Sequence, residues 1–216
     1  MAALSGLGWG GAALLDQPRR LGDTVLVGER SPAALDVVLL LDESGSFADY
    51  AAVREEALSE LASWAPDNLR AGDSITAIAF AGDAVVRIPQ ITIGAIDPDE
   101  SPVTLDTPSV GGTAILPALS AALNAVGDAG GTRTLIIVTD TIVEDADATS
   151  IEEAVQALDA TTMTVITPAG VGVTEPWQNA FPWEHTESAD PGSAGSTSLA
   201  LGRALAHATG QSIQDR

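Results

Sequence analysis

Short runs of continuously apolar residues alternate with segments of helical periodicity from about residue 35 onward. The clearest run extends from Val37 to Leu41, is apolar at every position and lies between Asp36 and Asp42. A strand that is apolar on both of its faces is typical of a parallel sheet covered by helices on both sides. Strands that alternate with helices along a chain build β-α-β units. The sequence therefore predicts an α/β fold around a mostly parallel sheet.

The same patterns predict the other elements. A helix begins after the first strand, near Phe47, and ends at Pro66, because apolar residues recur every three or four positions between them. Pro89 places another strand at a sheet edge, since proline has no N–H to donate to a neighbouring strand. Ser150 and Glu153 have the spacing of a capping box at the start of a helix. The remaining strands are predicted at 73–80, 84–93, 134–140 and 163–167, and the remaining helices at 115–126, 151–158 and 199–208.

Two other segments are predicted to be loops. Residues 170–195 are rich in Gly, Pro and Ser and favour an ordered loop with room for one short strand. Its aromatic residues Trp177, Phe181 and Trp183 either pack on the core or form a rim that contacts a partner. The second segment is acidic and is interpreted as a solvated loop, with a second cation site as the alternative; its acids are Asp97, Asp99, Glu100 and Asp106.

The composition limits the chemistry of the chain. A length of 216 residues suits one domain with a sizeable core. A formal charge of -21 argues against a nucleic-acid partner, because phosphates would be repelled. The chain has no cysteine and no lysine, which excludes thiolate chemistry, Schiff bases and a phosphate-loop lysine. Its two histidines, His185 and His207, are far apart in sequence, so a bound metal is expected to be a hard cation held by oxygen.

The predicted domain covers residues 35–209, between an N-terminal arm at 1–34 and a short tail at 210–216. The first 15 residues are apolar, but a spanning helix needs about 20 residues and a secretory signal needs a basic start. We therefore expect an arm of a cytoplasmic protein. The alternative is the remnant of a membrane anchor on a membrane-associated protein, with which Arg19 and Arg20 after the apolar run are compatible.

Polar side chains follow the predicted strands at three places. Asp42, Ser44 and Ser46 come directly after the first strand, Thr113 follows two glycines at the start of a helix, and Asp140 ends a later apolar strand. Ligands bind outside the carboxyl ends of the strands in open α/β sheets. Carboxylates and hydroxyls are the hard oxygen donors that Mg²⁺ and Ca²⁺ prefer, so these residues predict a cation site.

This pattern resembles the von Willebrand factor type A domain, whose metal-ion-dependent adhesion site combines Asp-x-Ser-x-Ser, a distant Thr and a later Asp. The resemblance covers about residues 35–209 and implies a Rossmann-like three-layer α/β/α sandwich, with a mostly parallel central sheet and one antiparallel edge strand. It also implies that a divalent cation, Mg²⁺ with Ca²⁺ or Mn²⁺ as substitutes, captures an Asp or Glu carboxylate of a protein partner. The metal ligands that it implies are Asp42, Ser44, Ser46, Thr113 and Asp140.

Two positions depart from the family pattern. The family often has Met and Gly where this chain has Phe47 and Thr141, but neither position ligates the metal in the family. The departures therefore affect the shape of the ligand loops and leave the ligand set intact.

The resemblance implies a binding module that is not an enzyme, and three alternatives stay open. The first is the non-ATPase subunit of an AAA+ ATPase or chelatase-like complex, since the chain has no Walker motif. The second is a metal-dependent hydrolase with Glu43 as its base. In the third, Ser44 and Ser46 cap the following helix and Asp42 accepts backbone N–H groups without any metal.

Overall fold

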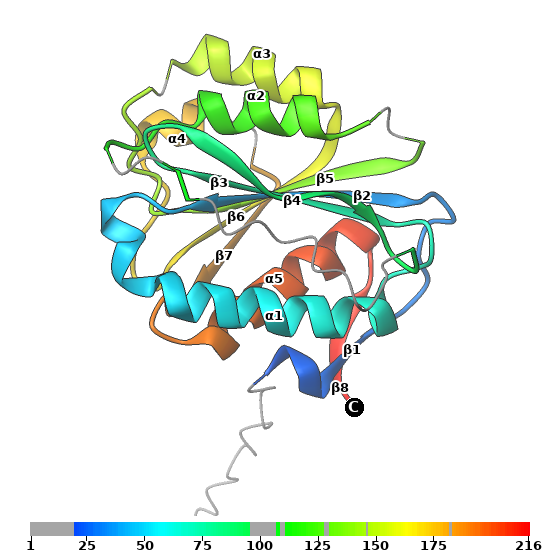
Figure 1. The fold of residues 1–216 in the computed structure, drawn as a ribbon. Helices are drawn as coiled ribbons and strands as arrows, with labels where there is room; N and C mark the ends of the chain where they lie inside the picture. Colours follow the sequence, from blue (N-terminus) through cyan, green and yellow to red (C-terminus); the bar gives the residue numbers. More distant parts are fainter. Residues whose placement is uncertain (1–19, 96–106, 109–110, 128–129, 146, 182) are drawn as a thin grey trace, which may run out of the picture.

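The computed structural model is a three-layer sandwich that describes residues 20–95, 107–108, 111–127, 130–145, 147–181 and 183–216 (Figure 1). The strands of its middle layer are, in spatial order, β4 (Ala84–Thr92), β3 (Ser74–Phe80), β2 (Leu35–Asp42), β5 (Thr132–Val138), β6 (Ala160–Pro168) and β7 (His185–Ala189). One face of this sheet is covered by α2 (Leu116–Ala125), α3 (Ala148–Leu158) and α4 (Glu175–Ala180), and the other face by α1 (Ala51–Asn68) and α5 (Ala194–Thr209).

Five strands of the sheet are parallel, and β4 pairs antiparallel with β3 at one edge. This arrangement confirms the predicted Rossmann-like α/β/α sandwich, including the edge position that Pro89 indicated. The central strand β2 lies between β3 and β5, and each of its residues is buried. The continuous apolar run of β2 is therefore explained by helices on both faces of the sheet.

Alternate residues of β2 pack into two separate cores. Leu39 packs with Trp64 in the core under α1 and α5, whereas Leu40 packs with Leu119 in the core under α2, α3 and α4. Burying one such leucine completely stabilises the fold by about 1.5–3 kcal/mol. The two cores hold the strand from both sides and so fix the direction in which its carboxyl end leaves the sheet.

A two-stranded ribbon lies outside the predicted domain limits. Strand β1 (Thr24–Val27) follows the 3₁₀ helix η1 (Leu21–Asp23) and pairs antiparallel with β8 (Ser212–Asp215). Leu21 is completely buried, and the Trp64 indole N–H donates to the Thr24 carbonyl oxygen at 2.9 Å. The folded unit thus extends past the predicted limits at residues 35 and 209, because strands of four residues are too short to show a periodicity. Residues 1–19 of the predicted arm lie outside the described residues.

Three local features can also be compared with the predictions. Asp147, and not Ser150, caps α3, since its side chain accepts the Thr149 backbone N–H and the Ser150 hydroxyl. The region 170–195 holds the unpredicted helix α4 as well as the short strand β7. Trp177 and Phe181 are buried and stack with ring centroids 4.8 Å apart, so the aromatic residues of this region pack on the core.

None of the described helices is both long and apolar enough to span a membrane.

A buried carboxylate, Asp73, connects the start of β2 to the loop before β3. Arg30 donates to both carboxylate oxygens at 2.7 Å, and the backbone N–H groups of Leu35 and Arg70 donate at 2.8 and 2.7 Å. Burial acts to raise the pKa of Asp73, but these hydrogen bonds and the Arg30 charge outweigh it and lower the pKa below its ordinary value. Folding therefore favours the ionised carboxylate.

We predict that Asp73→Asn destabilises the protein by about 3–5 kcal/mol at neutral pH, because the buried Arg30 loses its counter-charge. In the wild type this stabilisation is present above the unfolded pKa of about 3.9 and is lost as the pH falls through the lower folded pKa. Urea unfolding at neutral and acid pH measures both effects. Asp67→Asn is the control, since the exposed Asp67–Arg216 pair is worth about 0–1 kcal/mol. Equal losses in the two variants at neutral pH would contradict the prediction.

Candidate metal centre

Strand β2 ends at Asp42, which is 1% exposed. The Ser44 backbone N–H donates to its Oδ1 at 2.9 Å, and the Thr139 hydroxyl donates to its Oδ2 at 2.7 Å. Burial raises the pKa of Asp42, the hydrogen bonds from Ser44 and Thr139 oppose this, and the charge of Asp140 raises the pKa further, so that it lies above its ordinary value. The site therefore disfavours the negative charge of Asp42, and a bound cation would compensate it.

The segment after β2 brings two hydroxyl groups together. Ser44 directly precedes the 3₁₀ helix η2 (Gly45–Tyr50), and its side chain makes no capping hydrogen bond. Its Oγ atom lies 3.2 Å from the Oγ atom of Ser46. The capping interpretation is therefore wrong for Ser44, although Asp42 does accept a backbone N–H as that interpretation expects. Each hydroxyl oxygen keeps a lone pair that can face a cation.

Asp140 reaches the same edge of the sheet from the neighbouring strand. Strands β2 and β5 are parallel with Leu41 opposite Val138, so the residues that follow them leave the sheet side by side. The Asp140 Oδ1 atom accepts the Ile142 backbone N–H at 3.0 Å. Its charge is close enough to Asp42 to raise the pKa of that residue. The sheet thus brings two like charges together where both residues are buried.

Thr113 is held at this edge by its backbone neighbours. Its carbonyl oxygen accepts the Glu144 N–H at 2.8 Å, and the next residue, Ala114, donates to the Ala81 carbonyl oxygen just after β3. The preceding Gly112 has a φ of 87°, a conformation that favours glycine. Within the described part of the chain, no hydrogen bond joins the Thr113 side chain to the other four predicted ligands. The structure therefore links Asp42, Ser44 and Ser46 by hydrogen bonds, and it brings Asp140 to the neighbouring strand end and Thr113 to an adjacent loop.

Glu43, the base of the hydrolase alternative, is turned toward two arginines. Its Oε1 atom lies 3.2 Å from Arg54 Nη2 and 3.4 Å from Arg87 Nη1, and each of the three side chains is less than a tenth exposed. Arg54 also donates to the backbone oxygen of Asp42 at 3.4 Å. Glu43 therefore belongs to a buried ion-pair group beside the ligand loop, in which Arg54 and Arg87 compensate its charge.

Two residues outside the predicted ligand set hold the loops in place. Thr139 donates to Asp42 and accepts the Thr141 N–H at 3.0 Å, and its position beside Asp140 was a usable signal. Asp145 accepts the backbone N–H groups of Ile115 and Leu116 at 2.8 Å and so caps α2 from another loop. Asp145 has no sequence signal, because the helix that it caps lies about 30 residues earlier in the chain.

The candidate ligands are two carboxylates and three hydroxyls, a donor set that suits a hard cation such as Mg²⁺. Among the described residues, no group of three or more His, Asp or Glu side chains could hold a metal instead. His185 and His207 stack with ring centroids 4.5 Å apart. His185 is the first residue of β7 and so lies at the amino end of its strand, whereas the predicted ligands lie at the carboxyl ends. The acidic residues considered for a second cation site, Asp97, Asp99, Glu100 and Asp106, lie outside the described residues.

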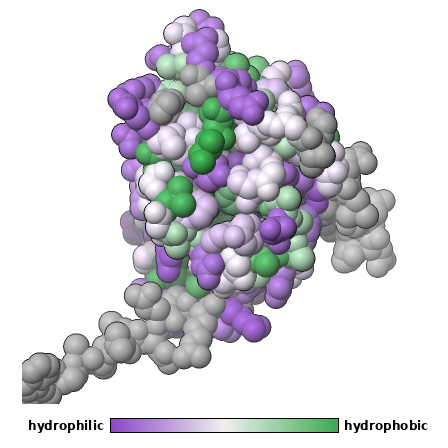
Figure 2. Space-filling model, turned by 90° about the vertical axis from the view of Figure 1, so that its left-hand side faces the viewer, coloured by the Kyte–Doolittle hydropathy of each residue, from purple (hydrophilic) through white to green (hydrophobic). Residues whose placement is uncertain are grey.

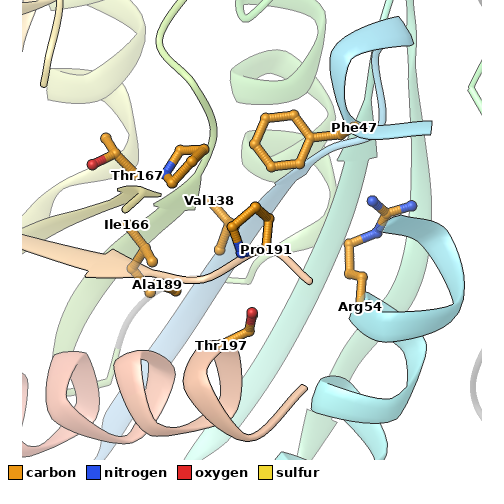
Figure 3. A pocket seen from close by; sticks show the side chains of 9 residues that line it. Phe47, Arg54, Val138, Ile166, Thr167, Ala189, Pro191 and Thr197 are labelled. Atoms are coloured by element: carbon orange, nitrogen blue, oxygen red, sulfur yellow. The ribbon is translucent and has the colours of Figure 1, made fainter. Parts of the chain in front are cut away.

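A small apolar pocket lies beside the candidate centre, among the carboxyl ends of β5, β6 and β7 and the start of α5 (Figure 3). Its volume is about 30 Å³. Phe47 lines it together with Pro191, Val138 and the aliphatic part of Arg54 (Figure 3). Phe47, one of the two departures from the family pattern, thus shapes the surface beside the ligand loop.

Comparison with known proteins finds similarity in structure only. No protein-family model matches the sequence, and no curated protein matches it. Proximal thread matrix protein 1 from the mussel byssus has a TM-score of 0.61 at 19% identity, over 89% of this chain and 50% of that one. A second structure of the mussel protein is described as having a zinc-occupied MIDAS motif; it has a TM-score of 0.57 at 15% identity, over 89% of this chain and 50% of that one.

Two bacterial structures have the same arrangement. A von Willebrand factor type A protein from Catenulispora acidiphila has a TM-score of 0.54 at 18% identity, over 85% of this chain and 49% of that one. The protein BatB from Bacteroides thetaiotaomicron has a TM-score of 0.53 at 20% identity, over 81% of this chain and 98% of that one. This chain thus has the fold of a von Willebrand factor type A domain, and it spans about half the length of the mussel and Catenulispora chains.

We predict that Thr139→Val destabilises the fold by about 1–3 kcal/mol in a chelator, because Asp42 Oδ2 and the Thr141 N–H each lose a buried partner. Thr139→Ser keeps the hydroxyl and removes one methyl group, so its loss should be smaller. Urea unfolding of the two variants beside the wild type measures the difference. The prediction is contradicted if the valine variant is as stable as the serine variant.

Proposed function

We propose that this protein is a divalent-cation-dependent protein-binding module. The observation that supports it most strongly is the meeting of Asp42 and Asp140 at the ends of two adjacent parallel strands, with the hydroxyls of Ser44 and Ser46 beside them. Two buried like charges are costly unless an opposite charge accompanies them. The fold supports the same function, since structures with this fold include one described with a metal-occupied site.

The cation would be held by Asp42, Ser44, Ser46, Thr113 and Asp140. Mg²⁺ suits a site with few anionic ligands and retained waters, and Ca²⁺ or Mn²⁺ could replace it. Neutral hydroxyls bind a cation without cancelling its charge, so the bound ion keeps an electrophilic position for one more oxygen ligand. A carboxylate of Asp or Glu in a protein partner is the ligand that this position would accept.

The partner should present its carboxylate among basic residues. The chain has 30 acidic and nine basic residues, and the side chains of Arg30, Arg54, Arg87 and Arg133 are all less than a tenth exposed. These arginines pair with carboxylates, most of which are buried as well, so the outward-facing charge stays strongly negative. Basic residues around the captured carboxylate would be attracted to this surface, whereas a wholly acidic partner would be repelled. Binding without catalysis is the activity that we propose, because Glu43 is engaged by arginines.

We predict that excess Mg²⁺ or Mn²⁺ raises the melting temperature of the wild-type protein, because an ion bound by the native state alone stabilises that state. Asp140→Asn should lose most of this gain. In a chelator the same variant should melt at or above the wild-type temperature, since it removes the charge that opposes Asp42 and keeps an acceptor for the Ile142 N–H. Differential scanning calorimetry with metal and with chelator measures both effects.

Glu152→Gln is the matched control, because it also removes one negative charge but lies on the exposed side of α3. This variant should keep the full metal-dependent gain. The proposal fails if the wild-type melting curves in excess metal and in chelator coincide. It also fails if the melting temperature of Asp140→Asn rises with metal as much as that of Glu152→Gln.

A further inference from the structure

Two large apolar side chains are exposed on the loops beside the candidate metal centre. Ile142 is 66% exposed and follows Asp140 by two residues, and Val171 is 40% exposed in the loop after β6. Among the described residues the other exposed large hydrophobic side chain is Leu123, at 42%, near the end of α2. Isolated exposed apolar residues are common on protein surfaces, so the position of Ile142 and Val171 needs a second observation before it indicates a function.

The backbone that presents Ile142 is held in an unfavourable conformation. Thr141 has a φ of 63°, and a β-branched residue rarely adopts this left-handed region. Three hydrogen bonds keep it there: its N–H donates to Thr139 Oγ1 at 3.0 Å, its Oγ1 accepts the Thr174 N–H at 3.0 Å, and its carbonyl oxygen accepts the Thr174 hydroxyl at 2.9 Å. Backbone strain that the surrounding structure maintains is typical of functional sites.

The same hydrogen bonds join the loops of Ile142 and Val171. Thr174, which bonds to Thr141, closes the loop that carries Val171, and the Thr167 hydroxyl donates to the Val171 carbonyl oxygen at 2.8 Å. Ile142 is also connected to the candidate centre, because its N–H donates to Asp140 Oδ1. Figure 2 looks onto this end of the molecule and shows strongly hydrophobic patches among hydrophilic residues. The two side chains thus lie on connected loops that adjoin the predicted ligands.

We propose that Ile142 and Val171 form an apolar rim that selects the partner segment, by contacting aliphatic side chains next to the carboxylate residue that the metal captures. The inference rests on the proposed function. An aliphatic residue beside the carboxylate removes the rim from water when the carboxylate reaches the metal, and a glycine there does not. The rim would distinguish between basic partner segments by their aliphatic side chains. The acidic surface cannot do so, since it attracts every basic segment.

The test uses three short peptides and the protein in excess Mg²⁺. The peptides are acetyl-Gly-Asp-Gly-amide, acetyl-Leu-Asp-Leu-amide and acetyl-Leu-Asn-Leu-amide, and NMR titration gives the dissociation constant of each. We expect the Leu-Asp-Leu peptide to bind the wild type about tenfold more tightly than the Gly-Asp-Gly peptide. The Asn peptide should bind at least tenfold more weakly than the Leu-Asp-Leu peptide. Ile142→Ser combined with Val171→Ser should remove the advantage of leucine over glycine and leave Gly-Asp-Gly binding unchanged.

Leu123→Ser is the control, because it removes from α2 a leucine that is about as exposed as Val171, and it should keep the tenfold advantage. Equal binding of the two Asp peptides by the wild type would overturn the rim and leave carboxylate capture standing. An advantage that persists in the double variant would also overturn the rim. Failure of both Asp peptides to bind in Mg²⁺ would overturn the proposed function and the rim with it. A double variant that changes only self-association of the protein would assign these residues to contacts between copies of the chain, against our inference.

Discussion

The parallel pairing of β2 with β5 is the constraint on which the candidate site depends. Because Leu41 lies opposite Val138, Asp42 and Asp140 lie at the carboxyl ends of neighbouring strands. The charge of Asp140 is therefore close enough to affect the pKa of Asp42. Neither carboxylate can move away, since Asp42 is fixed by Ser44 and Thr139 and Asp140 by the Ile142 N–H. The fold thus holds two like charges together, and a bound cation is the simplest way to compensate them.

The rest of the molecule packs against this edge and bonds to it. The apolar cores on the two faces of the sheet fix the strand ends, and the buried group of Glu43, Arg54 and Arg87 supports the ligand loop from behind. Asp145 joins the loop after β5 to the first turn of α2, next to Thr113. Each loop at the site is therefore tied to another loop or to the sheet, which is the preorganisation that a binding site needs.

Much of the fold could be predicted from the sequence because its strongest signals are local. The apolar run of β2 follows from the helices that cover both of its faces, and the edge position of β4 follows from the N–H group that Pro89 lacks. The ribbon of β1 and β8 could not be predicted, since its two strands are short and almost 190 residues apart in the chain. The helix cap at Asp147 was misjudged because Ser150 and Glu153, one turn further along the chain, have the spacing of a capping box.

Part of the candidate site could also be predicted, because its signals are local in the sequence. Asp42, Ser44 and Ser46 are adjacent in the sequence, and Asp140 ends an apolar run, so strand order alone brings them to one edge. The strained conformation of Thr141 and the exposure of Ile142 depend on hydrogen bonds from Thr174, more than 30 residues away, and no local pattern encodes them. Tertiary hydrogen bonds thus determine the surface around a site whose ligands the sequence indicates.

The most direct test of this account is the position of a bound metal. Crystals grown in Mn²⁺ would give anomalous scattering from the ion, and an anomalous difference map would locate it independently of any assumed ligand. We expect one strong peak enclosed by the carboxylates of Asp42 and Asp140 and the hydroxyls of Ser44, Ser46 and Thr113. Ordered density for these five side chains with no peak among them, at saturating Mn²⁺, would contradict the central claim.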